Sequence, residues 1–213
     1  MIIHLLYGGL EIKNLSTTAL IKKIHGLQNL LYKKESANAV HLVIAWFQHT
    51  SGLTKPILEP PHAASKYVNS IWISNFINSL SSHQVQIILQ KTFTLSPQRY
   101  NDHALMDDIT KIISSALTLK RLNECRIYLQ VTWVSDIANV KGDKILESAL
   151  KGERSTNQIS NIQWPLQQRP NEQTWKIWRK TIRQIYCCNN NNLLHRQFAP
   201  NTNHELLRAH LAL

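Results

Sequence analysis

Apolar residues recur at intervals of three and four through the first part of the chain, the spacing that predicts amphipathic helices. One helix is expected over residues 16–35, with Ser16 or Thr17 available as its N-cap. A second is expected over residues 38–52, ending near Gly52, because glycine readily adopts the left-handed backbone of a helix C-terminus. The apolar stripes are Leu20, Ile24, Leu27 and Leu31 in the first helix, and Val40, Val43, Ile44 and Phe47 in the second.

The stretch that follows, residues 54–62, contains three prolines. Proline removes a backbone donor and favours extended geometry in the residue before it, so this stretch is predicted to be a linker or a rigid corner. A third helix is expected over residues 63–80, and short apolar segments within residues 85–95 could form a small β-hairpin. The less regular stripe of the third helix consists of Val68, Ile71, Trp72, Asn75 and Ser79.

The segment 121–138 fits two patterns, because its apolar residues recur at helical spacing and also alternate as they do in a strand. We favour a helix, since the apolar positions continue to Ile137, beyond the usual length of a strand. A last strong helix is expected within residues 164–188. In residues 121–138, the residues at helical spacing are Leu122, Cys125, Leu129 and Trp133, and the alternating residues are Ile127, Leu129, Val131 and Trp133. The apolar face of the last helix consists of Trp175, Trp178, Ile182 and Ile185.

These segments together predict a mainly α protein with an irregular multi-helix fold. The chain has 213 residues, 43% of them hydrophobic, which is enough to bury a substantial core. Residues 1–55 are expected to form an N-terminal helical pair and residues 62–188 a helical core. Residues 189–213, which open with a run of asparagines, are expected to form a low-complexity tail.

Basic residues outnumber acidic ones, since 24 Lys and Arg against 13 Asp and Glu give a formal net charge of +11. Such a surface attracts phosphate groups or anionic lipid. No apolar run approaches the roughly 18 residues that span a bilayer, and the cysteines suggest no disulfide framework. We therefore expect a soluble, intracellular protein without a membrane partner, and the composition does not distinguish cytoplasm from nucleus.

The run Met106, Asp107 and Asp108 is of the kind found at the metal site of a reverse transcriptase. Two-metal phosphoryl transfer needs several carboxylates that converge on metals about 4 Å apart. No aspartate precedes Asp102, so the upstream carboxylate that a polymerase requires is missing. We therefore expect no catalytic residue and no enzymatic activity.

The apolar residues around this acidic pair predict a helix instead. At about 100° per residue, Asp107 lies nearly opposite Ile109 and faces solvent. Asn101 is expected to cap this helix, with Asp102 in its first turn. Asp107 can then pair with Lys111 one turn later, so each acidic residue has a structural role.

The candidate zinc ligands by residue type are Cys187, Cys188, His195, His204 and His210. Adjacent cysteines chelate poorly compared with a pair separated by two residues, and the other spacings match no ordinary zinc finger. The sequence contains no Gly-rich phosphate loop and no credible Ser-His-Asp set. We therefore predict neither a metal nor a cofactor.

Three short motifs, "SPQRYNDHALMDD", "LNECRIYLQVTWVSDI" and "WPLQQRPNEQTWKIWRKTI", resemble in the same order a region found downstream of the reverse transcriptase domain in open reading frames of eukaryotic retroelements. With a lead-in at "GLTKPILEPP", the resemblance covers residues 40–186. It implies a thumb-like or tethering element beside a polymerase whose carboxylates lie in the preceding domain. The matching positions are Pro97, Arg99, Asn101, Asp102, Met106, Asp107, Asn123, Cys125, Arg126, Leu129, Ser135, Asp136, Ile137, Trp164, Pro165, Trp175 and Trp178.

The last helix carries a basic stripe that is a candidate for binding nucleic acid. Lys176, Lys180 and Arg183 share one flank, Arg179 lies at its edge, and Arg169 directly precedes the helix. Basic residues aligned on one helical flank can follow a phosphate backbone. The alternative is an ordinary solvated face.

We therefore expect a non-catalytic accessory module of a retroelement protein, one that helps a reverse transcriptase by binding template or primer, RNA or DNA. The first alternative is a helical domain for protein–protein interaction whose basic face is incidental. The second is a decayed fragment of a polyprotein without independent activity. The sequence does not indicate an oligomeric state.

Overall fold

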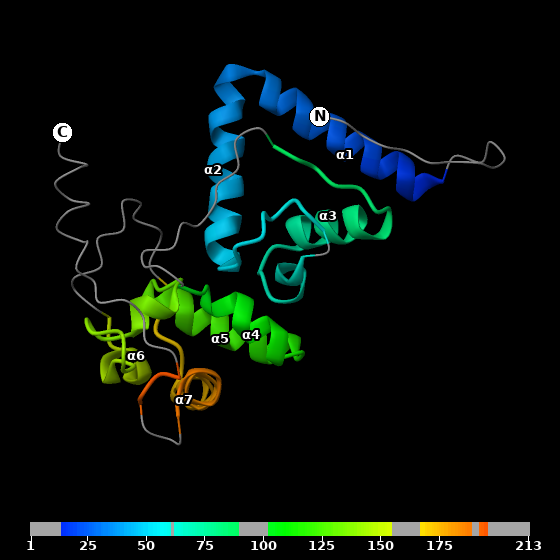
Figure 1. Ribbon diagram of the computed structural model, residues 1–213. Coiled ribbons are helices and arrows are strands. Elements are labelled where there is room, and N and C mark those ends of the chain that lie inside the picture. The colour runs from blue at the N-terminus through cyan, green and yellow to red at the C-terminus, as the bar shows by residue number, and fades with distance from the viewer. Residues whose placement is uncertain (1–13, 61, 90–101, 155–166, 189–191, 196–213) are drawn as a thin grey trace, which may run out of the picture. The chain divides into compact units, whose positions relative to one another are not determined.

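The computed structural model describes residues 14–60, 62–89, 102–154, 167–188 and 192–195, and these residues are mainly helical. The chain divides into two compact units, Met1–Leu95 and Ser96–Leu213 (Figure 1). The sequence placed the first division between residues 55 and 62, whereas helix α3 (Ile71–Ser82) packs with α1 (Leu15–Tyr32) inside the first unit. None of the described helices combines the length and the apolar character that a membrane crossing requires.

Helices α1 and α2 (Lys34–Ser51) confirm the first two predicted helices. The N-cap of α1 is Asn14, whose side chain accepts a hydrogen bond from the Ser16 amide at 3.0 Å, so the expectation of Ser16 or Thr17 as the cap is wrong. A short polar side chain two residues earlier takes this role because the helix starts at Leu15. Helix α2 ends at Gly52, whose φ of 66° is the left-handed geometry predicted there.

The proline-bearing stretch after α2 is a fixed corner held by the buried side chain of Gln48. The Gln48 Nε2 donates to the carbonyl oxygens of Leu53 at 2.6 Å and Lys55 at 3.0 Å. The Gln48 Oε1 accepts a hydrogen bond from the Ile57 amide at 2.8 Å. One amide therefore satisfies three backbone groups in a stretch whose prolines leave it without regular secondary structure.

The third predicted helix is divided into a 3-10 turn, η1 (Ala63–Lys66), and α3, whose N-cap is Ser70. The apolar stripe expected there is wrong, because Ile71 is 83% exposed and Trp72 is 56% exposed. A helix that begins at residue 71 buries the set with regular three- and four-residue spacing instead. That set is Ile73, Phe76, Ile77 and Leu80.

Residues 85–89 form no strand, and the remainder of the β-hairpin expected near residues 85–95 lies outside the described residues. The expected tail, residues 189–213, is described only at residues 192–195. Isolated antiparallel bridges join Lys144 to Leu193 and Cys187 to Leu194, so this short piece pairs with other segments of the second unit.

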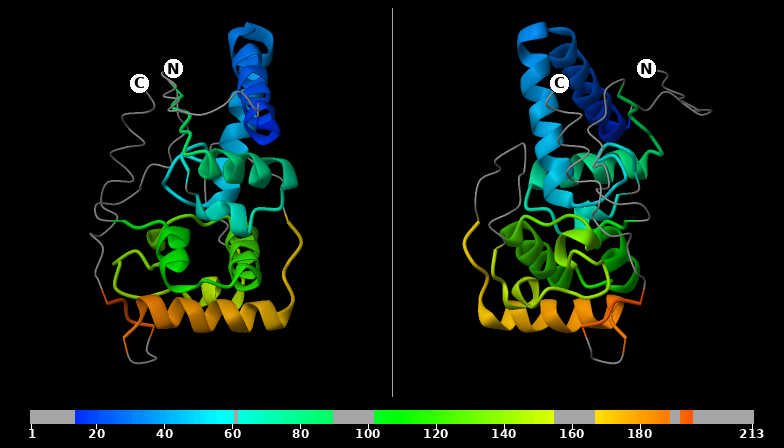
Figure 2. Two further views of the ribbon diagram at one scale, coloured as in Figure 1. Left: turned by 90° about the vertical axis from the view of Figure 1, so that its right-hand side faces the viewer. Right: turned by 60° about the vertical axis from the view of Figure 1, so that its left-hand side comes forward.

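The second unit is built on α7 (Glu172–Tyr186), which crosses α4 (Leu105–Ile112) and α5 (Ala116–Leu129) and packs against α6 (Glu147–Lys151), as Figure 2 shows. Trp175 and Trp178 of α7 are fully buried, and their rings meet edge to face at 6.4 Å. Each indole N–H has a carbonyl partner, since Trp175 donates to Pro170 and Trp178 donates to Ala149, both at 3.0 Å. The predicted apolar face of the last helix is thus the centre of this core.

Helix α5 ends earlier than expected, because the segment that fits both patterns contains both structures. The helix stops at Leu129, and Gln130 follows with a φ of 59°. Val131 and Thr132 then have no regular secondary structure, and Trp133 is extended and bridged to Ala104 before a 3-10 turn, η2 (Val134–Ile137). The prediction of a continuous helix to Ile137 is therefore wrong, because this left-handed residue ends the helix before Val131, Thr132 and Trp133, residues that favour extended backbone.

Candidate nucleic-acid interface

The acidic pair lies in the first turn of α4, so the helix predicted there is confirmed. Lys111 forms its salt bridge with Asp108 at 3.2 Å, whereas the sequence assigned that contact to Asp107. The helix begins at Leu105 with Ala104 as its N-cap, so Asp102 precedes the helix and does not lie in its first turn. Asn101, the expected cap, lies outside the described residues.

Asp102 connects the start of α4 to η2. Its carboxylate accepts hydrogen bonds from the Ser135 amide at 3.1 Å, from the Ser135 hydroxyl, and from the His103 amide at 2.9 Å. Asp136 acts in the same way within the turn, accepting from the amides of Thr132 at 2.7 Å and Trp133 at 2.8 Å. These carboxylates satisfy backbone donors, and no group of three metal-ligating side chains converges among the residues that the structure describes.

Among the residues of the second unit that the structure describes, Arg126 is the most buried charged residue, with no exposed surface. Its Nε donates to Asn123 Oδ1 at 2.8 Å, and its Nη1 donates to the Val131 carbonyl oxygen at 3.1 Å. The guanidinium thereby fixes the chain where α5 ends. Arg126 and Asn123 both belong to the motifs singled out in the sequence, as do Asp102, Ser135 and Asp136.

Helix α7 separates an apolar face from a basic face. Its N-cap is Asn171, whose side chain accepts from the Thr174 amide at 2.9 Å. At about 100° per residue, the buried tryptophans face away from Lys176 and Lys180, which are exposed. Because both indoles are enclosed in the core, they do not form a surface on which bases could stack.

The five basic residues predicted to bind nucleic acid differ in exposure and in their contacts within the protein. Within the part of the chain that the structure describes, the side chains of Lys176 and Lys180 form no hydrogen bond or ion pair, and both residues are exposed. Arg183 is half-buried, and its Nε donates to Asn192 Oδ1 at 3.3 Å. The two lysines are therefore the members of the stripe best placed to meet a phosphate group.

The other two arginines are engaged within the second unit. Arg169 donates to the Lys151 carbonyl oxygen at 3.0 Å, and its guanidinium lies 5.5 Å from the ring centre of Trp175. Arg179 forms a salt bridge with Glu172 at 2.5 Å. The hydrogen bond from Arg179 lowers the pKa of the Glu172 carboxyl group, which keeps this acid charged beside the stripe.

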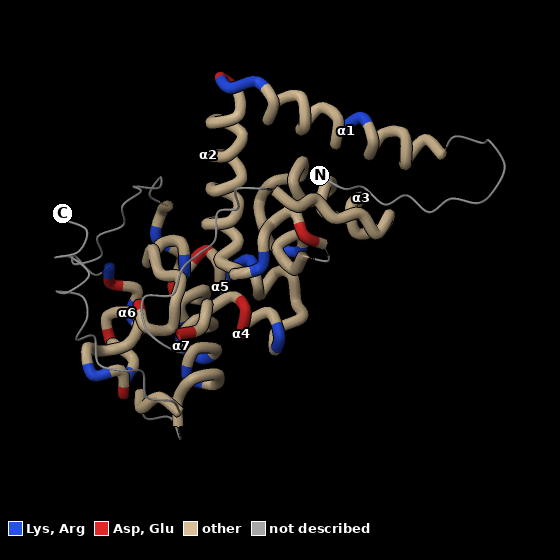
Figure 3. The backbone as a smooth tube through the Cα atoms, turned by 45° about the horizontal axis from the view of Figure 1, so that its top comes forward, with Lys and Arg blue, Asp and Glu red and all other residues tan. Residues whose placement is uncertain are grey.

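Figure 3 shows that basic residues occur in both units, so the face of α7 is one of several positive surfaces. The junction of α1 and α2, for example, carries exposed Lys33 and Lys34 beside Glu35. A role for α7 in binding therefore has to be separated from the effect of net charge, and this junction supplies a control of equal charge.

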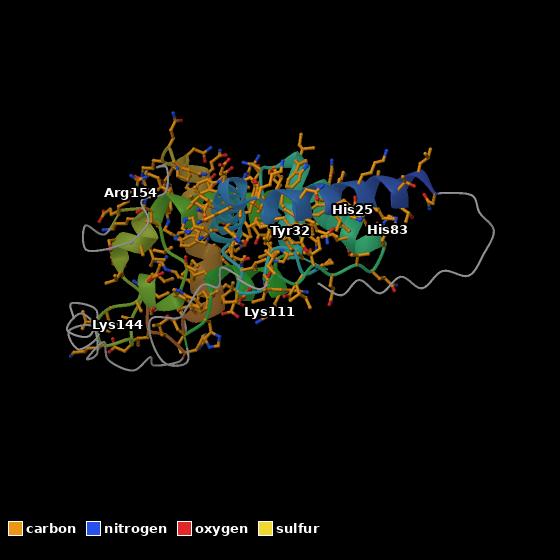
Figure 4. The ribbon with its side chains drawn as sticks, turned by 90° about the horizontal axis from the view of Figure 1, so that it is seen from above. His25, Tyr32, His83, Lys111, Lys144 and Arg154 are labelled. Carbon is orange, nitrogen blue, oxygen red and sulfur yellow. The ribbon has the colours of Figure 1, made fainter. Side chains whose placement is uncertain are left out.

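A cavity of about 380 Å³ opens beside the C-terminal end of α7. Its walls come from α4, η2, the end of α7 and residues 192–195, which are far apart in the sequence. Lys111, labelled in Figure 4, lies at its rim with its side chain 71% exposed. The residues that line it are His103, Asp108, Lys111, Ile112, Val134, Ile185, Tyr186, Leu194 and His195.

Two polar contacts shape this cavity. The Tyr186 hydroxyl donates to Asp108 Oδ2 at 3.2 Å. The Cys188 Sγ lies 2.9 Å from His195 Nδ1. The sequence assigned Asp108 and His195 to separate patterns. Asp108 and Tyr186 are 78 positions apart, so no local pattern in the sequence signals that they meet. The two remaining histidines of the rejected zinc set, His204 and His210, lie outside the described residues.

The buried hydroxyl of Tyr186 predicts a dependence of stability on alkaline pH. Burial, followed by the charge of Asp108, raises the pKa of Tyr186 above its usual value. A group whose pKa is higher in the folded state stabilises the fold below its unfolded pKa, and this contribution is lost as the pH rises further. We expect the free energy of unfolding to fall above about pH 10, with this group contributing up to about 1.4 kcal/mol per pH unit.

Urea unfolding between pH 8 and 11 measures this effect. Tyr186→Phe should show the smaller fall, because it has no phenol to ionise in the unfolded chain. Tyr32→Phe is the matched control, since Tyr32 is 85% exposed (Figure 4). A Tyr186→Phe variant with the same alkaline slope as the wild type would contradict the expectation.

The first unit contains a second hollow, a groove of about 510 Å³ between α1, α2 and α3. The stripe predicted for α2 lines this groove, and Val43 within it remains 48% exposed. Leu30 of α1 and Trp72 of α3 are exposed on the same groove at 47% and 56%. The groove is therefore an apolar surface that the described residues leave open.

No family model, no curated protein and no solved structure matches this chain.

Proposed function

We propose that this protein binds nucleic acid through the exposed face of α7 and acts as a non-catalytic accessory module beside a reverse transcriptase. The observation that carries the proposal is the pair Lys176 and Lys180, exposed on the face of α7 opposite the buried tryptophans. One helical turn separates them, about 6 Å along the axis. Two neighbouring ammonium groups at this spacing suit a run of phosphates on one strand.

The surroundings of the two lysines favour an anionic ligand. The acid nearest to them in the sequence, Glu172, forms a salt bridge with Arg179 and also interacts electrostatically with Lys176, so Lys180 is the lysine whose charge it offsets less. The net charge of +11 adds a long-range attraction for phosphate. The reverse transcriptase is proposed as the partner only because of the sequence resemblance. The residues of the resembling motifs form buried polar contacts of the second unit, and the motifs contain no set of catalytic carboxylates.

Removing the two ammonium groups should weaken binding without unfolding the protein. We expect Lys176→Gln with Lys180→Gln to lower the affinity for a short RNA–DNA duplex roughly tenfold at low salt. The slope of log affinity against log salt should become shallower by about 2, because two phosphate contacts are lost. Fluorescence anisotropy of a labelled duplex across a salt series measures both quantities.

The matched control is Lys33→Gln with Lys34→Gln, which removes the same charge from the junction of α1 and α2. This variant should keep most of the affinity if α7 is the interface. Equal losses in the two variants would show that net charge alone drives binding. A wild-type protein with no affinity, or with a flat salt response, would refute the proposal.

A helical domain for protein–protein interaction is the second candidate function. The observation that favours it is the groove of the first unit, where Leu30, Val43 and Trp72 stay exposed. Monomeric proteins rarely expose a contiguous apolar surface without a use for it. If the anisotropy experiment shows no binding of nucleic acid, protein–protein interaction becomes the favoured function.

A further inference from the structure

We propose that the cavity of the second unit binds a single unpaired nucleobase, with guanine preferred. The proposal rests on the proposed function, because it assigns a specificity pocket to the same nucleic-acid interface. Arg183 of α7 lies one turn before Tyr186, and the cavity opens at the C-terminal end of this helix. A strand that follows the basic face can pass this end of α7 and present one of its bases here.

The walls of the cavity suit a flat aromatic heterocycle. Ile112, Val134, Ile185 and Leu194 contribute apolar surface, and Tyr186 contributes an aromatic ring. The volume of about 380 Å³ leaves room for a base together with part of its sugar. Proteins that read an unpaired base hold it between apolar or aromatic side chains and bind its polar edge with hydrogen bonds.

The polar edge of the cavity is dominated by Asp108. Its carboxylate oxygens offer about four lone-pair positions. Lys111 occupies one at 3.2 Å and the Tyr186 hydroxyl occupies another, also at 3.2 Å. A carboxylate with acceptor positions left over suits a ligand edge that presents adjacent N–H donors.

Guanine presents such an edge, because its N1–H and N2 amino group lie side by side. Uracil and thymine present carbonyl oxygens on either side of one N–H, and a carboxylate repels those oxygens. Adenine offers an amino group next to an acceptor nitrogen. Asp108 therefore selects guanine by attraction and disfavours uracil by repulsion.

The rim of the cavity supplies a partner for the phosphate of the same nucleotide. Lys111 is bound to Asp108 through one contact, and its side chain is 71% exposed. A base inserted toward Asp108 leaves its phosphate near this ammonium group. His195 also lines the cavity.

The test compares three RNA–DNA duplexes that are identical except for one position, which carries an unpaired G, an unpaired U or no unpaired base. By fluorescence anisotropy we expect the unpaired G to bind about tenfold more tightly than the unpaired U. Asp108→Asn should abolish that preference, because the amide is no longer an acceptor on both atoms. Ile112→Trp should lower the affinity for the unpaired G to that of the paired duplex by filling the cavity.

Ile112 is 55% exposed, so the larger side chain can be added at the mouth without disrupting the core. Leu117→Trp is the matched control, since Leu117 is 59% exposed on α5 and does not line the cavity. Circular dichroism confirms that each variant folds. Lys176→Gln with Lys180→Gln should weaken all three duplexes by the same factor.

Two outcomes separate this proposal from the proposed function. Equal affinity for all three duplexes, or an Ile112→Trp variant that still prefers the unpaired G, overturns the cavity proposal and leaves binding by α7 intact. If no duplex binds, a titration with guanosine monophosphate followed by ligand-observed NMR tests the cavity alone. Binding that Ile112→Trp removes supports the cavity, and absence of binding overturns it.

Discussion

Gly152→Ala is expected to lower the free energy of unfolding of the second unit by about 3 kcal/mol, the sum of backbone strain and a steric clash. Gly152 ends α6 with a φ of 73°, a left-handed geometry that costs an alanine about 1–2 kcal/mol. A Cβ atom at this position would also lie 2.6 Å from the Cε2 and Cζ2 atoms of Trp175.

The indole of Trp175 has little freedom to move aside. It is fully buried, its Nε1 donates to the Pro170 carbonyl oxygen, and Tyr128 packs against it edge to face at 5.8 Å. Tryptophan fluorescence during urea unfolding measures the loss. Trp46→Phe and Trp72→Phe in the background remove the described tryptophans of the first unit from the signal.

Gly26→Ala is the matched control, because it adds the same methyl group at a glycine with no atom within 4 Å of the added Cβ. Gly26 lies inside α1, where alanine should stabilise the helix by up to about 1 kcal/mol. Because α1 belongs to the first unit, this effect is measured by urea unfolding of the protein that keeps Trp46 and Trp72. The two substitutions should therefore have opposite signs. A Gly152→Ala variant as stable as the wild type would mean that α6 and Trp175 do not approach as closely as described.

Arg126→Ala is expected to lower the free energy of unfolding of the second unit by about 4 kcal/mol. The substitution leaves a cavity, and it leaves buried hydrogen-bonding groups without a partner. The Asn123 side chain and the Val131 carbonyl oxygen would each lose a donor where water cannot replace it. Arg126→Lys should be intermediate, since one ammonium group does not reproduce the geometry of the planar guanidinium.

Urea unfolding in the same background measures these losses. Arg121→Ala is the control on the same helix, and a partly exposed side chain of this kind should change stability by no more than about 0.5 kcal/mol. Equal losses of stability in Arg126→Ala and Arg121→Ala would show that the buried hydrogen bonds of Arg126 do not stabilise the fold more than a partly exposed arginine does.

The helical character could be predicted from the sequence because the apolar spacing in α1, α2, α4 and α7 is regular. The face of α3 could not, since its start depends on the turn at Ser70 rather than on apolar residues upstream of it. The end of α5 was missed for a similar reason. Gln130, a residue without strong helix-breaking chemistry, adopts the left-handed geometry that turns the chain.

The candidate site was predictable only in part. The helical period places Lys176 and Lys180 on one face, and both are exposed. The same period places Arg183 with them, but its contact with Asn192 arises because the chain folds back after α7. Contacts of Arg169 with Lys151 and of Tyr186 with Asp108 also join distant segments, and helical spacing carries no information about such contacts.

The residues of the three sequence motifs belong to the second unit. Met106, Cys125, Trp175 and Trp178 are buried in its core, and Asp102 binds backbone and side-chain donors. Such positions define how a chain folds, and they do not by themselves define what it binds. The exposed lysines and the cavity are therefore the places where function has to be tested.

The hydrogen bonds of Gln48 have a consequence for the order in which the chain acquires structure. They join residues that are five to nine positions apart, whereas the Trp178 indole bonds across 29 residues and the Tyr186 hydroxyl across 78. Closing a short loop costs less entropy and takes less time than closing a long one. The corner after α2 can thus form while the chain is still emerging from the ribosome, before the partners of the second unit's long-range contacts have been made.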